Sequence, residues 1–219
     1  PRRSRASVWH AIVYRLAVPT HVQVRFEDGS EPVTDLRVHR LEYVDGLNQP
    51  FLLTLGITSP NAHVDPKQVL GKHIVVTFEG EPWLHQVRGV VAPFGQRTAL
   101  MGHEGLSTYE AVVRPPLWLL AKRFARRIHQ NVNAVDVITA TVAGLGGIVP
   151  PPVPKVARPL DTSEYTVQYD ETDLGFVRRM LAENHLVSFF DATASGTWTI
   201  ADDLATAAPL LPIPLSYHP

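Results

Sequence analysis

A cluster of acidic residues has the composition that acid–base catalysis requires. Asp170, Glu171 and Asp173 follow Tyr169 within one short segment. Paired carboxyl groups can donate and accept protons when both reach a substrate. Acidic side chains are also common where a helix begins, because they accept hydrogen bonds from unpaired amides and lie near the positive end of the helix dipole. The second role fits the pattern better, and we predict that these carboxylates are structural.

Other potential sites are excluded by what surrounds them. The run from Gly144 to Gly147 is rich in glycine like a phosphate-binding loop, but prolines follow where the phosphate-binding helix would have to begin. The ten histidines include neither an HExxH motif nor a helical i, i+4 pair, and the chain has no cysteine. There is also no G-x-S-x-G motif. We therefore predict no catalytic residue, no cofactor, no metal and no enzyme activity.

The composition is that of a globular protein with few charges to attract polyanions. The 219 residues are 45% hydrophobic and 19% charged, with a formal net charge of −1. This near-neutral balance argues against binding of nucleic acid or of an anionic membrane surface. The longest uncharged run, residues 137–154, is interrupted by glycines and prolines, so we predict no membrane insertion. The chain opens at Pro1 without a visible signal peptide, and we expect a processed or truncated piece of a longer protein.

The first half of the sequence predicts an antiparallel β-barrel or sandwich domain over residues 1–115. Apolar and polar residues alternate there with the period of two that is typical of strands with one buried face. Between Val33 and Tyr43 the apolar phase changes, with Leu36 and Val38 on even positions and Leu41 and Tyr43 on odd ones, which predicts a bulge near His39 or Arg40. The clearest alternating runs lie at residues 22–26, 51–57, 74–78 and 109–113.

The second half predicts a smaller α+β domain over residues 116–200. The expected elements are a short helix from Pro116, a helix over 134–143 capped by Asn133, a strand over 165–169, a helix from Thr172 to about Asn184, and closing strands over 186–190 and 198–201. Asn184 or His185 must end the last helix, because no glycine follows it. The proline-rich linker at 148–159 is expected to be an extended connector outside any sheet. Residues 201–219 are expected to start a truncated second barrel.

Three segments resemble the VgrG family, the spike proteins of type VI secretion, and the related phage baseplate hub proteins. They are residues 109–120 (YEAVVRPPLWLL), 127–138 (RIHQNVNAVDVI) and 165–190 (YTVQYDETDLGFVRRMLAENHLVSFF). The likeness extends from about His21 to Asp203, with His129 standing where the family usually has phenylalanine. The residues that match the family pattern are Tyr109, Pro116, Trp118, Arg127, Gln130, Gln168, Tyr169, Glu171, Asp173 and Phe176.

The resemblance implies a structural hub of a contractile injection machine. Hubs of this kind are homotrimers in which each chain carries two similar barrels, so that a hexameric tube protein meets six equivalent surfaces. It further implies spike or needle domains, tip proteins or effectors as partners, and assembly in the cytoplasm followed by secretion or injection. On this reading the core anchors of the second domain are Trp118, Leu119, Tyr169, Phe176, Phe189 and Phe190.

Alternative functions remain open at the level of the sequence. A phage tail baseplate hub of the same fold shares all the matching residues. A secreted hydrolase or effector enzyme on a β-rich scaffold, and an adaptor domain that loads cargo, are the alternatives from other classes. The strands that form the interfaces cannot be identified from the sequence, because interface and core residues share one apolar signature.

Overall fold

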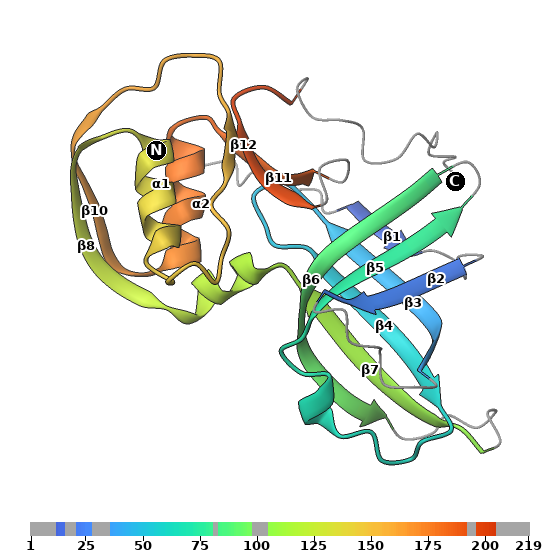
Figure 1. The fold of residues 1–219 in the computed structure, drawn as a ribbon. Helices are drawn as coiled ribbons and strands as arrows, with labels where there is room; N and C mark the ends of the chain where they lie inside the picture. The colour runs from blue at the N-terminus through green and yellow to red at the C-terminus, as the bar shows by residue number, and fades with distance from the viewer. Residues whose placement is uncertain are drawn as a thin grey trace, which may run out of the picture.

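The computed structural model describes residues 12–15, 21–27, 36–80, 83–97, 105–191 and 196–204. Its larger sheet consists of seven antiparallel strands. Their order across the sheet is β1-β3-β4-β7-β6-β5-β2. The sheet curls into a half-barrel (Figure 1) with β1 and β2 as its edges. The strands are β1 (Ile12–Arg15), β2 (His21–Phe26), β3 (Arg37–Asp45), β4 (Leu52–Ser59), β5 (His73–Gly80), β6 (Trp83–Arg97) and β7 (Ser107–Arg114), and a short 3-10 helix, η1 (Pro66–Gln68), precedes β5.

The half-barrel follows the alternation of the sequence. Leu53, Leu55, Val76 and Val113 are completely or almost completely buried on its inner face. The register of β3 against β4 shifts between Val38 and Arg40, which confirms the predicted bulge. A second shift lies between Val91 and Phe94 in β6, a strand of 15 residues. Bulges of this kind increase local twist, and they let long strands curl around a core.

Gly89 lies where β6 and β7 approach each other closely. A Cβ at this position would lie 2.7 Å from the carbonyl oxygen of Arg114 and 2.8 Å from Cγ1 of Val113. We expect Gly89→Ala to lower the free energy of unfolding by about 1–3 kcal/mol, because backbone atoms would have to move apart. Gly95→Ala in the same strand is the matched control, since a Cβ there meets nothing within 4 Å. Equal urea midpoints for the two variants would contradict the packing argument.

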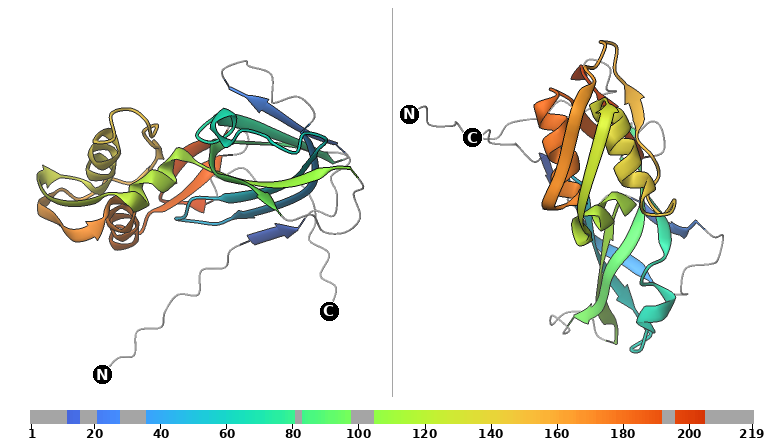
Figure 2. Two further views of the ribbon diagram at one scale, coloured as in Figure 1. Left: turned by 90° about the horizontal axis from the view of Figure 1, so that it is seen from below. Right: turned by 90° about the vertical axis from the view of Figure 1, so that its left-hand side faces the viewer.

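The remaining elements form a second cluster beside the half-barrel. They are η2 (Pro116–Lys122), β8 (Phe124–Val132), α1 (Ala134–Ala143), β9 (Val153–Lys155), β10 (Ser163–Thr172), α2 (Asp173–Glu183), β11 (Val187–Asp191) and β12 (Thr197–Ala201). Strands β8 and β10 form a two-stranded antiparallel ribbon, and β11, β12 and β9 form a three-stranded sheet. Figure 1 and the two views of Figure 2 show the ribbon and both helices at the end of the molecule away from the half-barrel.

Both helices begin and end as their sequences predict. The side chain of Asn133 accepts a hydrogen bond from the amide of Asp136, and that of Thr172 accepts one from the amide of Gly175. Helix α1 ends at glycines, of which Gly146 and Gly147 have positive φ. Helix α2 ends without glycine, and His185 adopts the left-handed conformation there, with a φ of 51°. Within the described ranges, neither helix is long and apolar enough to cross a membrane.

The proline-rich connector departs from its prediction. Residues 153–155 form β9, which pairs in parallel with β12, so this segment is part of a sheet. Proline has no amide hydrogen to donate to a neighbouring strand. Because β9 lies at the edge of its sheet, Pro154 can occupy it with little loss of hydrogen bonding. The prediction of an extended connector outside any sheet was therefore wrong for these three residues.

The half-barrel and the second cluster share one hydrophobic core. The rings of Phe51 and Phe190 meet edge to face with centroids 5.2 Å apart. Asn48, which has a φ of 59°, donates its amide to the carbonyl of Ser188 and accepts the amide of Ser188 on its side chain. Buried residues on both sides of Pro115 thus belong to a single cluster, and the predicted boundary between residues 115 and 116 stays a prediction. Residues 205–219, most of the predicted second barrel, lie outside the described residues.

Candidate assembly surface and the network behind it

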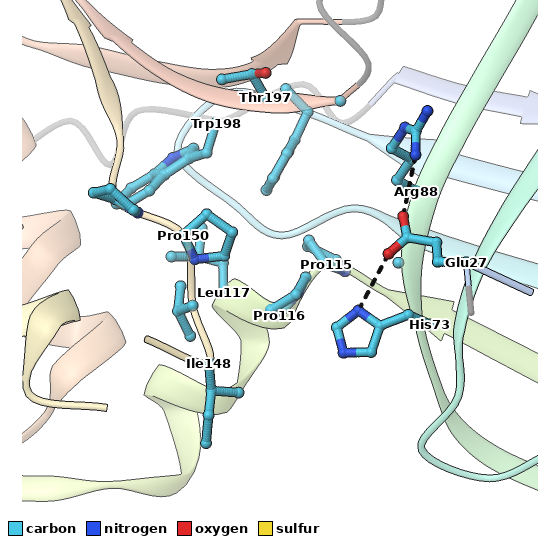
Figure 3. A pocket seen from close by; sticks show the side chains of 15 residues that line it. Glu27, His73, Arg88, Pro115, Pro116, Leu117, Ile148, Pro150, Thr197 and Trp198 are labelled. Atoms are coloured by element: carbon cyan, nitrogen blue, oxygen red, sulfur yellow. Dashed lines mark hydrogen bonds and ion pairs between the residues drawn. The ribbon is translucent and has the colours of Figure 1, made fainter. Parts of the chain in front are cut away.

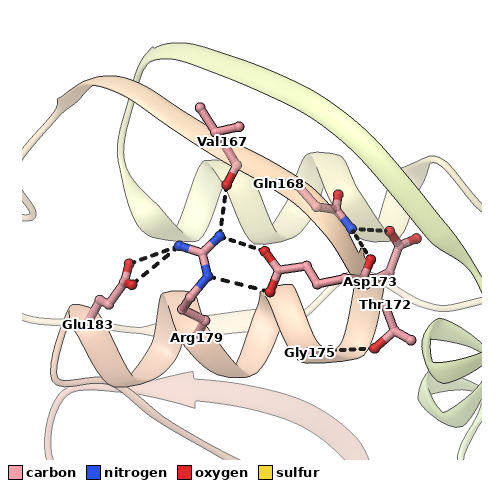
Figure 4. A network of polar contacts seen from close by, with 8 residues as sticks. Val167, Gln168, Thr172, Asp173, Gly175, Arg179 and Glu183 are labelled. Atoms are coloured by element: carbon pink, nitrogen blue, oxygen red, sulfur yellow. Dashed lines mark hydrogen bonds and ion pairs between the residues drawn. The ribbon is translucent and has the colours of Figure 1, made fainter.

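The buried carboxylate of Asp173 links the ribbon to the helices. Its side chain is completely buried, and Gln168 on β10 donates a hydrogen bond of 2.8 Å to its Oδ1. Nε of Arg123 contacts the other carboxylate oxygen, and NH1 of Arg127 on β8 lies 3.6 Å from Oδ1. Figure 4 shows Gln168 and Asp173 facing each other where β10 passes into α2. The acidic cluster therefore begins a helix, as predicted, and one of its members is also the centre of a charged network.

Arg123 joins this network to the end of α1. Its guanidinium donates to the carbonyls of Gly144 and Thr141, which are among the unpaired carbonyls at the C-terminus of α1. A cation at a helix C-terminus and a carboxylate at a helix N-terminus both interact favourably with the helix dipoles. Arg123 has no local sequence signature for this role, because its contacts join residues that are far apart along the chain.

A second charged network, centred on Arg179 of α2, connects this helix to β10. Arg179 donates to Glu171 at 2.6 Å, to the carbonyl of Val167 at 2.8 Å and to Glu183 at 3.3 Å. Figure 4 shows the guanidinium between these three acceptors. The hydrogen bond to Glu171 raises the pKa of Arg179 above its ordinary value. Together with the Asp173 contacts, this group fixes which face of the ribbon points toward the helices.

His129 packs as an aromatic ring on the inner face of the ribbon. Its ring stacks on Phe176 of α2, with centroids 5.8 Å apart and an interplanar angle of 17°. Nε2 is buried and has no hydrogen-bond partner. Burial, and then the positive charge of Arg127, lower the pKa of His129 below its ordinary value of 6.5. The stacking explains how histidine serves at a position where the resembling family has phenylalanine.

His129 should make the fold sensitive to acid. Folding lowers the pKa of His129, so protonation of this ring favours the unfolded state. The stability linked to the neutral ring is fully present above pH 6.5 and is lost as the pH falls through the folded-state pKa. We expect His129→Phe to raise the free energy of unfolding by about 1 kcal/mol at neutral pH and by more near pH 5. Urea unfolding between pH 5 and pH 8 measures the difference, with His63→Gln at the surface as the control. A constant difference across that range would contradict this account.

The outer face of the ribbon is apolar and exposed. We define the ribbon face by its large hydrophobic residues, which are Phe124 (69% exposed), Ile128 (65%), Tyr165 (59%), Val167 (45%) and Tyr169 (69%). Val167 lies opposite Ile128, and Tyr165 lies opposite Gln130, so these side chains share one face. The guanidinium of Arg126 lies over the ring of Tyr169 and pairs with Asp170 at 3.2 Å. This is an exposed hydrophobic patch of the kind that marks interaction sites.

Of the six predicted core anchors, two are only partly buried and a third is exposed. Tyr169 is exposed, so its assignment to the core was wrong, because β10 turns its alternating apolar residues outward. Trp118 and Leu119 are only partly buried, since the 3-10 helix η2 directs Leu117 and Leu120 into the core. Phe176, Phe189 and Phe190 are buried.

The other matching residues lie apart from the network. The hydroxyl of Tyr109 donates to the carbonyl of Asn61 in the half-barrel. Pro116 begins η2. The cations of Arg114 and Lys122 lie 5.8 Å and 5.5 Å from the ring of Trp118, and the Nε1 of Trp118 is buried without a hydrogen-bond partner. Gln130 is exposed on the ribbon. Of the residues that match the family pattern, the structure therefore brings together Arg127, Gln168, Glu171, Asp173 and Phe176 around the ribbon and α2.

A cavity of about 240 Å³ lies between the half-barrel and β12. Figure 3 shows Glu27, His73 and Arg88 on one side of it, opposite prolines and Trp198. Glu27 lies 3.3 Å from the guanidinium of Arg88 and 3.7 Å from Nδ1 of His73, so its carboxylate is paired with Arg88 and lies near the His73 ring. Within the described residues no group of three or more His, Asp or Glu side chains is placed to hold a metal ion. The arrangement is an ion pair on one side of a largely apolar cavity.

A protein-family comparison decides the affiliation of the chain. The family described as phage tail baseplate hub (GPD) matches residues 44–218. This chain belongs to the phage tail baseplate hub family. The match covers the half-barrel from the end of β3, the ribbon with its network, and both helices. It assigns a structural role to this hub chain and confirms the prediction that it is not an enzyme.

The hub chain is also similar to known spike and tail proteins. It is 29% identical over 159 residues to the type VI secretion system spike protein VgrG1a of Pseudomonas aeruginosa, covering 71% of this chain and 24% of that protein. The E. coli c3393 protein, a component of the type VI secretion system, has the same fold with a TM-score of 0.68 and 23% identity over 84% of this chain and 50% of that one. A tail protein from Neisseria meningitidis MC58 matches with a TM-score of 0.57 and 14% identity, and the match covers 82% of this chain and 49% of that one.

These findings confirm the resemblance to VgrG spike proteins and the tail-hub fold. The hub chain spans between 20% and 24% of the length of the first three curated relatives. The similarity is therefore to one region of those proteins.

Proposed function

We propose that the hub chain is a docking platform in a contractile injection machine, where it trimerises and joins a spike to a hexameric inner tube for delivery of effectors. The observation that carries this proposal is the match to the baseplate hub family over residues 44–218. The structure supports it physically, because the charged network makes a stiff unit of the ribbon and helices while one apolar face stays exposed. A docking platform needs such a rigid, partly apolar surface and needs no catalytic cleft.

The proposal includes the division of labour along the chain. Residues 1–115 are the tube-facing barrel region, residues 116–200 are an α+β region that holds the ribbon, and residues 201–219 lead into a second barrel. A threefold ring meets a sixfold ring without mismatch when each protomer presents two equivalent surfaces. The residues of the family pattern are proposed to act as structural supports of this arrangement. Assembly in the cytoplasm precedes secretion or injection of the complex, together with tip domains or effectors.

Binding to the tube protein tests the proposal. The complete natural polypeptide that contains this chain is mixed with the tube protein of the same system and examined by negative-stain microscopy and by mass measurement in solution. We expect threefold particles that cap the ends of tube rings. Monomers that leave the ring ends bare would overturn the proposal.

A phage tail baseplate hub of the same fold is the second candidate function. The family description and the fold shared with a bacterial tail protein favour it. The two candidates differ in where the chain is found. A type VI component is released together with its tube protein by contracting cells, whereas a phage hub is recovered in particles that carry DNA.

A further inference from the structure

The ribbon face is large enough to form the apolar part of a protein interface. Aromatic side chains of this kind present about 150–250 Å² each, and the five members of the ribbon face are between 45% and 69% exposed. Together they expose about 500 Å² of apolar surface, which is near the upper end of what the largest patch of a monomer shows. A stable interface buries about 800 Å² on each partner. The ribbon face and its polar rim can supply most of that area.

The ribbon cannot hide this face by turning over. Its inner side is occupied by Gln168, His129 and Arg127, which contact Asp173 and Phe176 of α2. Turning the ribbon would break these contacts and leave the carboxylate of Asp173 buried without its partners, which is costly. The outer face must therefore be covered by something other than the described part of this chain.

The charges on the ribbon face fit a copy of the same face. Arg126 and Asp170 lie beside the apolar residues and neutralise each other across 3.2 Å. A face without net charge can approach its own symmetry mate without like-charge repulsion. Aromatic and apolar side chains with an arginine are the composition that interface cores favour, and lysine and glutamate are depleted there.

We propose that the ribbon face is buried against other copies of this chain, with the three ribbons of the trimer converging on the threefold axis so that each contacts its two neighbours. This rests on the proposed hub function, which supplies the trimer. Side chains that lie close to a threefold axis meet their own copies, and a face without net charge allows this approach without like-charge repulsion. The ribbon also lies at one end of the elongated molecule, where other copies can reach it (Figures 1 and 2). A sixfold tube would need this surface twice in each chain, and among the described strands the ribbon occurs once.

Oligomeric state measured by light scattering across a dilution series tests the proposal on the complete natural polypeptide. We expect Ile128→Asp to raise the concentration at which the trimer dissociates by at least about 100-fold, because a charge would be buried without a partner. Leu70→Asp is the matched control, since Leu70 is 48% exposed on the half-barrel side, outside the ribbon face. We expect it to leave the trimer unchanged.

Cross-linking gives a second readout that does not depend on a disruptive change. This chain has no cysteine, so Val167→Cys and Leu70→Cys introduce unique thiols into it. With a short bis-maleimide reagent, we expect Val167→Cys to give covalent dimers and Leu70→Cys to give none. If Ile128→Asp fails to fold, this pair decides the question.

The outcomes separate the two proposals. A trimeric wild type in which Ile128→Asp stays trimeric and Val167→Cys does not cross-link overturns the ribbon contact and leaves the hub function intact. A variant that stays trimeric but no longer binds the tube protein assigns the ribbon face to the tube and also overturns the contact. A wild type that is monomeric at all concentrations removes the trimer, and with it both proposals.

Discussion

Asp173→Asn should lower the free energy of unfolding of this hub chain by about 3 kcal/mol. The Asp173 side chain is completely buried between Arg123 and Arg127, and removing its charge leaves two guanidinium groups facing each other without a counterion. Breaking a buried pair from one side costs about 3–5 kcal/mol. The lower end applies because the two arginine side chains are 26% and 30% exposed and keep part of their hydration. Urea unfolding followed by circular dichroism measures the loss.

Asp170→Asn is the matched control for this prediction. Asp170 lies three positions earlier, pairs with Arg126, and both side chains are about two-thirds exposed. Exposed ion pairs contribute little, so we expect a change within about 0.5 kcal/mol. Asparagine also tolerates the positive φ of this position. If both variants lost the same stability, the network would not depend on burial of the Asp173 charge.

Phe176→Ala should lower the free energy of unfolding by about 3–5 kcal/mol. Phe176 is fully buried, stacks on His129, and has the guanidinium of Arg179 5.2 Å from its ring centre. Truncating a buried phenylalanine removes its transfer free energy and leaves a cavity. The midpoint of urea unfolding should fall with an unchanged denaturant slope, which distinguishes lost stability from a changed unfolded state.

Tyr169→Ala is the aromatic control for Phe176→Ala. Both residues match the family pattern, but Tyr169 lies on the exposed ribbon face. At concentrations where the chain is monomeric, we expect a change within about 0.5 kcal/mol. The same variant should weaken association between copies if the ribbon face is buried in the trimer. A large loss of stability in the monomer would instead place Tyr169 in the core, against the structure.

The residues of the family pattern serve two roles: some stabilise the inner side of the ribbon, and others form its exposed outer side. Asp173, Gln168 and Phe176 support the inner side of the ribbon, and variants there should unfold the chain. Tyr169 lies on the outer side, where it shares the ribbon face with Ile128, and variants there should act on assembly. The division explains how one motif can contain both buried charged residues and exposed aromatic residues.

Much of the fold could be predicted from local patterns. The alternating runs located β2, β4, β5 and β7, and the change of phase located the bulge between Val38 and Arg40. The caps Asn133 and Thr172 were predicted correctly, as was a helix end near His185. Each of these features depends on neighbouring residues and backbone geometry, so a single sequence contains the necessary information.

The ribbon shows where such patterns are insufficient. Alternation in β10 indicates that two faces differ, but it does not say which face a helix will cover. The usual assumption buries the apolar side, whereas here the helices cover the side that carries Gln168, Arg127 and His129. That choice depends on the carboxylate of Asp173 and on Arg123, which meet across 50 residues of sequence. Long-range ion pairs of this kind have no local signature, and only the folded chain brings their partners together and turns the apolar residues of the ribbon outward.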